Sequence, residues 1–284
     1  MKRRQVLTLV STTAVPIAGC LNSTESSDID MSLSTSEQSD TPTPSTDRTL
    51  NVGETYESSD GLTVDVRDVR VRKLIRSTSV GSSTHIDVAC LDDHQFAITE
   101  AEATDADGNS ILSDIRFALD VDGVQYPQDD QHCYWAFPPG LNDRPGLPAF
   151  PAPITDATDA AIVWLRDDTP SVRWRLSPET VELLGQSPMF TVRSFETPDS
   201  VSRGDLFKAT VTVANTGERD GHFITEFGAG PLSDHGEVTI DVPAGTEQTH
   251  TGTMDPHYSD DTDEIDVTLD WGCDRLHRTV SVTN

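Results

Sequence analysis

The chain has 284 residues, of which 48 are acidic and 20 are basic, so its formal net charge is −28. Repulsion at that charge destabilises a compact state in dilute buffer, whereas molar salt shortens the Debye length to about 3 Å and screens the repulsion. The composition therefore predicts a halophilic protein that works in very high salt. Because no basic stripe is evident along the sequence, the composition also argues against a nucleic-acid partner.

The first twenty residues have the pattern of an export signal. Arg3 and Arg4 precede a short apolar stretch, residues 8–18, and a bilayer span would need about 20 such residues. The arginine pair resembles the twin-arginine signal, which exports folded proteins. Ile17-Ala18-Gly19-Cys20 resembles the lipobox of prokaryotic lipoproteins, in which the thiol carries a lipid. With the acidic composition, the whole arrangement resembles a haloarchaeal lipoprotein. That resemblance implies a membrane partner through a lipid on Cys20, at the extracellular face of the cytoplasmic membrane.

The segment after the lipobox is expected to be a disordered stalk. Residues 21–48 are rich in Ser, Thr, Asp and Pro, and they cannot bury enough apolar surface to offset the entropy of ordering. The remainder divides into an expected first domain, residues 49–187, and a second, residues 188–284. The fold class predicted is all-β, with two tandem Ig-like β-sandwich domains after the signal peptide and the stalk.

In the first domain, short alternating runs bounded by turn residues predict strands. A slip in the alternation at Arg67-Asp68 predicts a β-bulge. Ser177, Pro178 and Gly185 predict one short helix, because they suit the N-cap, the first turn and the end of a helix. Pro138–Pro153 is proline-dense and is expected to be a loop without a strand. The strands expected are 62–71, 85–90, 96–103, 115–121, 161–165 and 172–176.

The second domain has seven expected strands at regular spacing, which is typical of an Ig-like sandwich. The strand 206–214 leads into Asn215-Thr216-Gly217, and a later turn reads Val242-Pro243-Ala244-Gly245. These features resemble the cell-adhesion-related Ig-like module of bacterial and archaeal surface proteins. The resemblance implies a fold and no particular ligand. The seven strands expected are 190–196, 206–214, 222–227, 237–242, 249–253, 264–271 and 278–282.

The cysteines and histidines of the first domain raise two alternatives. Cys90, His94, His132 and Cys133 could bind zinc or copper. However, Cys90 is in phase with the apolar positions of its strand, and a disulfide between Cys90 and Cys133 is simpler outside the cell. We therefore predict that disulfide, no metal, and a free, buried Cys273.

Other candidate sites have simpler structural interpretations. Asp105-Ala106-Asp107-Gly108-Asn109 has the spacing of calcium donors but no downstream Glu, and it fits a hairpin turn better. Tyr134, Trp135, Phe137 and Phe150 form either an exposed platform for a sugar or peptide, or, as we favour, part of the core. No nucleophile elbow, zinc-protease motif or phosphate loop is present in the sequence.

These observations favour a protein that is not an enzyme and needs no cofactor. The leading function is a lipid-anchored surface protein whose Ig-like modules interact with or adhere to an envelope protein or polysaccharide. The alternative is a solute- or metal-binding lipoprotein that delivers its ligand to a membrane partner.

Overall fold

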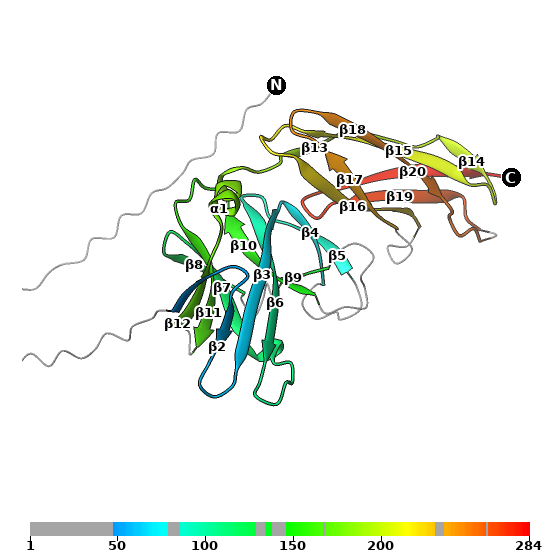
Figure 1. Cartoon of the computed structure of the whole chain (residues 1–284). Helices are drawn as coiled ribbons and strands as arrows, with labels where there is room; N and C mark the ends of the chain where they lie inside the picture. The colour runs from blue at the N-terminus through cyan, green and yellow to red at the C-terminus, as the bar shows by residue number, and fades with distance from the viewer. Residues whose placement is uncertain are drawn as a thin grey trace, which may run out of the picture. The chain divides into compact units, whose positions relative to one another are not determined.

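The computed structural model describes residues 48–78, 86–128, 134–137, 146–166, 169–230, 236–259 and 261–284. In these residues the chain consists of β-strands, one α-helix and a short 3-10 turn at Leu112–Asp114, so the predicted all-β sandwich fold is confirmed (Figure 1). They fall within one compact unit, Pro44–Asn284. The expected signal peptide and nearly all of the expected stalk lie outside the described residues.

The first pair of sheets is formed by β1–β12. A five-stranded sheet has the order β1-β12-β11-β7-β8, and a seven-stranded sheet has the order β2-β3-β6-β10-β9-β4-β5. Buried side chains from both sheets, including Trp174, Phe117 and Phe150, form one core. The strands are β1 Arg48–Asn51, β2 Thr55–Glu57, β3 Thr63–Arg72, β4 Leu74–Thr78, β5 Ile86–Cys90, β6 His94–Thr104, β7 Arg116–Val121, β8 Val124–Pro127, β9 Tyr134–Ala136, β10 Leu147–Pro153, β11 Ala160–Arg166 and β12 Thr169–Arg175.

The second pair of sheets is formed by β13–β20. The orders β13-β15-β18 and β14-β20-β19-β16-β17 are those of an Ig-like sandwich, in which alternating inward side chains of both sheets fill the core. Phe223, Val211 and Leu269 are fully buried there. The strands are β13 Phe190–Glu196, β14 Ser200–Ser202, β15 Phe207–Asn215, β16 Gly221–Ala229, β17 Gly236–Val242, β18 Glu247–Met254, β19 Glu264–Asp270 and β20 Arg275–Thr283.

The predicted bulge in β3 is confirmed. The register between β3 and β6 shifts between Arg67 and Arg70, and Asp68 adopts a φ of 48°, which Asp tolerates better than most residues. Val64 and Val66 are buried before the bulge and Val71 after it, so the inward phase changes by one residue. The bulge thereby places Arg70 and Arg72 on the face opposite the core.

The expectation that the proline-dense segment lacks a strand is wrong for its second half. Strand β10 pairs with β6 through residues 149–153 and with β9 through residues 147–149. Pro148 therefore has a partner only in β9, whereas Pro151 and Pro153 have partners only in β6. Because each proline is paired on one side alone, its missing N–H need not face a neighbouring strand.

The helix α1, Pro178–Gly185, begins as predicted, since Ser177 Oγ accepts a hydrogen bond from Thr180 N at 3.2 Å. Its last carbonyls are satisfied from the sheet. The fully buried Gln95 on β6 donates through Nε2 to the carbonyls of Leu183 and Leu184, at 3.1 and 2.9 Å. Such donors matter because the final carbonyls of a helix have no partner within the helix.

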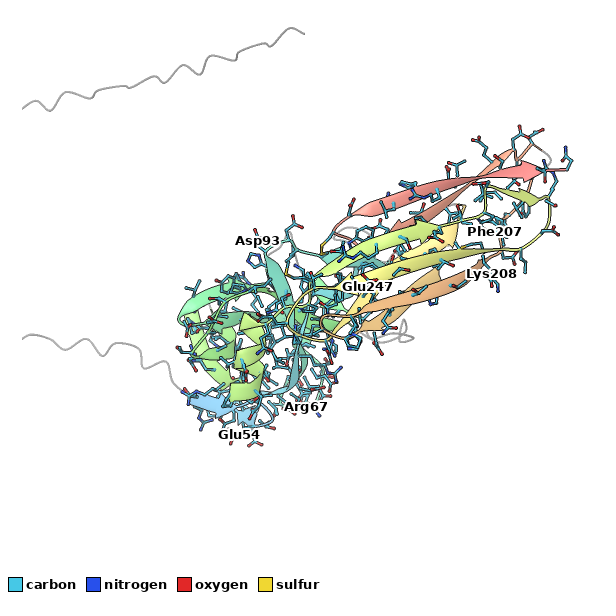
Figure 2. The ribbon with its side chains drawn as sticks, turned by 90° about the horizontal axis from the view of Figure 1, so that it is seen from above. Glu54, Arg67, Asp93, Phe207, Lys208 and Glu247 are labelled. Atoms are coloured by element: carbon cyan, nitrogen blue, oxygen red, sulfur yellow. A yellow bond between two sulfur atoms is a disulfide. The ribbon has the colours of Figure 1, made fainter. Side chains whose placement is uncertain are left out.

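Transfer from dilute to molar potassium chloride is expected to raise the melting midpoint. Acidic side chains such as Glu54, Asp93 and Glu247 are exposed on the surface (Figure 2). With 48 acids against 20 bases, repulsion exceeds attraction, and salt screens the repulsion. Thermal melts followed by circular dichroism test this, with sucrose as the control for general exclusion effects. A midpoint that does not respond to salt, or that responds equally to sucrose, would contradict the halophilic interpretation.

Candidate functional site: the boundary between the two pairs of sheets

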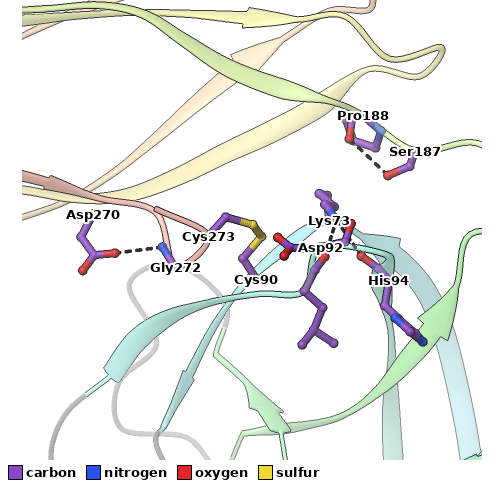
Figure 3. Close-up of a disulfide and its surroundings, with 10 residues drawn as sticks. Lys73, Cys90, Asp92, His94, Ser187, Pro188, Asp270, Gly272 and Cys273 are labelled. Atoms are coloured by element: carbon purple, nitrogen blue, oxygen red, sulfur yellow. Dashed lines mark hydrogen bonds between the residues drawn. A yellow bond between two sulfur atoms is a disulfide. The ribbon is translucent and has the colours of Figure 1, made fainter. Parts of the chain in front are cut away.

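A disulfide between Cys90 and Cys273 joins the first pair of sheets to the second (Figure 3). Cys90 ends β5, and Cys273 lies in the turn between β19 and β20. Their Cα atoms are 5.1 Å apart, within the range that a disulfide spans. The predicted bond between Cys90 and Cys133 is therefore wrong, as is a free, buried Cys273, which is bonded and exposed. Cys133 lies outside the described residues.

Cys90 lies on the apolar face of its strand, as expected, but that face packs against the second pair of sheets and not against the core of the first. Val88 and Cys90 pack against the core of the second pair of sheets, and so does the fully buried Leu74 of β4. The apolar side of β4 and β5 thus faces a neighbouring sandwich. Alternation in sequence showed that Cys90 faces apolar surroundings, but it could not show to which core they belong.

The turn that carries Cys273 fits closely against β5. A Cβ atom at Gly272 would lie 2.3 Å from the carbonyl oxygen of Val88, and Gly272 has a φ of 78°, so glycine meets both a steric and a conformational requirement. Gly272 N donates to Asp270 Oδ1 at 2.9 Å (Figure 3). This arrangement positions Cys273 beside the end of β5.

On the other side of the disulfide, Lys73 organises the chain between β5 and β6. Its Nζ donates to the carbonyl oxygens of Leu91, Asp92 and His94, the last two at 2.8 Å (Figure 3). Burial lowers the pKa of the Lys73 ammonium, and the neighbouring carboxylates Asp92 and Asp93 oppose this effect. One of the chain's few lysines therefore holds the bend that follows Cys90.

Arg219 makes a second connection across the boundary. Its Nη1 donates to the carbonyl of Val71 at 3.2 Å, and its Nη2 donates to Gln95 Oε1 at 3.0 Å. Burial, and secondarily the nearby Arg72, lower the pKa of Arg219. The buried Asn215 fixes the segment that carries Arg219, because Asn215 Nδ2 donates to the Arg219 carbonyl at 2.8 Å. Gln95 thus links α1, β6 and the second pair of sheets.

A groove of about 250 Å³ lies along the same boundary, and we call it the arginine groove. Arg70, Arg72 and Arg76 line it from β3 and β4, and His222 lines it from β16. Arg76 forms an ion pair with Glu237 of β17, and His222 Nδ1 contacts Asp241 Oδ1 at 2.5 Å. The apolar part of its lining includes Ile98, Phe137, Leu147 and Ile224.

The basic residues at this boundary were not predicted from the sequence, although their clustering along the chain was visible. Five of the 20 lysines and arginines lie within Arg67–Arg76, where we had noted no basic stripe. Arg67 pairs with Asp65 and Glu102, and Arg70 pairs with Asp68 and Glu100. The density of basic residues along the chain indicates that this segment is positively charged. Only the structure shows which of its guanidinium groups are paired with carboxylates.

The structure does not describe most of the remaining predicted site residues. Arg3, Arg4, Cys20 and His132 lie outside the described residues. In the part of the chain that the structure describes, no group of three or more His, Cys, Asp or Glu side chains is placed to hold a metal. None of the described helices is long and apolar enough to cross a membrane.

The Asp105 turn and the aromatic residues around Trp135 were the two other candidate sites. Asp105 Oδ1 accepts from the backbone N–H groups of Asp107 and Asn109, at 3.0 and 2.8 Å, so the predicted turn uses this carboxylate. These bonds lower the pKa of Asp105, with the side chain of Asn109 contributing most. Phe150 is fully buried in the first core, as favoured, while Trp135 and Phe137 are half-buried.

Comparison with known proteins identifies no family. No protein-family model and no curated protein matches the chain. A β-glucosidase from Erythrobacter marinus is 17% identical over 34% of this chain and 16% of its own, with a TM-score of 0.29. A β-sandwich protein from Clostridium difficile is 11% identical over 45% of this chain and 93% of its own, with a TM-score of 0.27. The chain thus spans about a sixth of that β-glucosidase, and these likenesses carry no argument about activity.

Proposed function

We propose that this chain is an exported, non-catalytic lipoprotein that presents its β-sandwich modules to an envelope protein or polysaccharide. The twin-arginine pattern at Arg3 and Arg4 supplies export, and Cys20 supplies the lipid anchor. The acidic composition suits a protein at the outer face of the cytoplasmic membrane of a halophile. The modules then act as a binding surface at the end of a tether formed by residues 21–48.

The observation that carries the proposal is the Cys90–Cys273 disulfide. Disulfides persist in oxidising environments outside the cytoplasm and are rare within it. This bond also joins two sheet systems, which the hydrogen bonds of Arg219 and the Arg76–Glu237 ion pair connect as well. Because the disulfide already fixes the two modules to each other, less conformational entropy is lost when a partner binds both of them.

The arginine groove favours a second candidate, the solute-binding lipoprotein. A mostly apolar hollow with a few converging polar groups is the usual form of a small-molecule site. At about 250 Å³ the groove is slightly below the usual size for such sites. In this alternative the same tether would hold the binding module near a membrane partner.

Substitution of Cys20 by serine is expected to release the protein from membranes or to block its processing. The serine hydroxyl cannot form the thioether that attaches the lipid. Membrane and soluble fractions from cells that express each form, probed with an antibody to the chain, measure the effect. The expected result is a shift of most of the protein to the soluble fraction, or its accumulation as the unprocessed precursor.

Cys133→Ser is the matched control, since it removes a thiol outside the lipobox and should leave the protein membrane-bound. A Cys20→Ser protein that is still processed and still bound to membranes would contradict the lipid anchor. Equal release of the Cys133→Ser protein would show that loss of any thiol has this effect, and would contradict the assignment to Cys20.

A further inference from the structure

The positive charge of the arginine groove is neutralised unevenly. Arg70 pairs with Asp68 and Glu100, and Arg76 pairs with Glu237. Arg72 differs from both. Among the described residues, no carboxylate oxygen lies within 4.0 Å of its guanidinium group, in a chain with more than twice as many acids as bases.

The contacts of Arg72 confirm this difference. Its Nη1 makes one long hydrogen bond, 3.4 Å, to the carbonyl of Val71. The carboxylates that act on Arg72 from a distance, Asp68 and Asp241, are used by Arg70 and His222. Burial and the adjacent Arg70 lower the pKa of Arg72. The guanidinium group is therefore half-buried beside like charge, an arrangement that an anion would stabilise.

The shape of the groove restricts which anion would fit. Its volume, about 250 Å³, equals that of about eight water molecules, so its occupant is small. Its lining beyond the arginines is largely apolar, with Phe137, Leu147 and Ile224 contributing side chains. Because Arg70 and Arg76 are already paired and only Arg72 of these three arginines has no described carboxylate partner, a ligand with a single negative charge matches the groove better than a polyanion does.

We propose that the arginine groove binds a small amphipathic carboxylate, with its apolar body against Phe137, Leu147 and Ile224 and its carboxylate on Arg72. A guanidinium group donates two parallel hydrogen bonds to a carboxylate, and such charge-assisted bonds are about twice as strong as neutral ones. This inference gives the solute-binding candidate a ligand class. It does not depend on the lipid anchor, so failure of one leaves the other intact.

Octanoate is a suitable probe, and calorimetric titration of the full-length Cys20→Ser chain, oxidised in molar potassium chloride, measures its binding. We expect saturable binding at one site, and binding of 1-octanol and of acetate weaker by about tenfold or more. The 1-octanol comparison tests the need for charge without any further substitution. Binding of 1-octanol as tight as that of octanoate, or no saturable binding of octanoate, would overturn the proposal.

Arg72→Gln should weaken octanoate binding by about tenfold or more, because the amide keeps a polar end but loses the charged fork. Arg67→Gln is the matched control: it lies on the same strand, pairs with Asp65 and Glu102, and does not line the groove. It should bind octanoate like the parent. Equal affinities of the Arg72→Gln and parent chains would overturn the assignment to Arg72, and so would an equal loss in Arg67→Gln.

Discussion

Replacement of Cys273 by serine is expected to lower the free energy of unfolding by about 2–5 kcal/mol. The bond connects residues 183 positions apart, and a cross-link over so long a loop restricts the unfolded chain strongly. Cys90→Ser should have the same effect, and the double variant should be no less stable than either single one, because the two substitutions remove one bond. Denaturant unfolding of the oxidised protein in molar salt gives these values.

Cys133→Ser is the control that separates the two pairings of Cys90. If Cys90 bonds to Cys273, Cys133→Ser should change stability little, and peptide mapping without reductant should recover Cys90 and Cys273 in one linked fragment. A Cys133→Ser protein as unstable as Cys90→Ser, with Cys273 alkylated in the folded parent, would show that the observed pairing is wrong.

The cysteine pairing illustrates what sequence could and could not predict. The alternation of Ile86, Val88 and Cys90 indicated an inward-facing strand, and β5 confirms that strand. Cys90 nevertheless bonds to a residue near the far end of the chain, in a turn that follows β19. Local periodicity reports which face of a strand is apolar, but it carries no information on which distant element covers that face.

The strand β10 and the role of Arg72 in the groove were not predicted from the sequence, for two different physical reasons. Prolines at 148, 151 and 153 argued against a strand because a proline cannot donate to a ladder. The segment is nevertheless paired, since its neighbours β6 and β9 each cover only part of it. For Arg72, the cluster of basic residues was visible in the sequence. No described carboxylate pairs with Arg72, because Asp68 and Asp241 point toward Arg70 and His222, and that is a property of the folded structure.

The Asn215-Thr216-Gly217 motif was recognised from the sequence as a turn, and the structure supplies its physical role. Asn215 is buried, and its Oδ1 accepts from the N–H groups of Met189 and Gly217, both at 3.0 Å. A Cβ atom at Gly217 would lie 2.2 Å from the carbonyl oxygen of Ser187. The motif therefore fastens the segment that leads into β13 against the end of β15.

Asn215→Ala is expected to lower the free energy of unfolding by about 3–5 kcal/mol. Besides its two accepted bonds, Asn215 donates through Nδ2 to the carbonyls of Arg219 and Val242, at 2.8 and 3.0 Å. Alanine would remove these hydrogen bonds from the two carbonyls and from the N–H groups of Met189 and Gly217. A buried polar group left unsatisfied costs about 1–3 kcal/mol, although solvent entry and local relaxation reduce the sum.

Asn109→Ala provides the matched control, because Asn109 is exposed and its Nδ2 donates to Asp105 Oδ2 at 2.9 Å. That variant should lose less than about 1 kcal/mol, since water can replace the exposed bond. Denaturant unfolding of the two variants in molar salt compares them directly. Equal losses would contradict the role given to Asn215. Asn215→Ala also removes the hydrogen bond to the Arg219 carbonyl, so the segment around Arg219 should become more mobile. Hydrogen exchange at the start of β16 should therefore be faster in Asn215→Ala than in the parent chain.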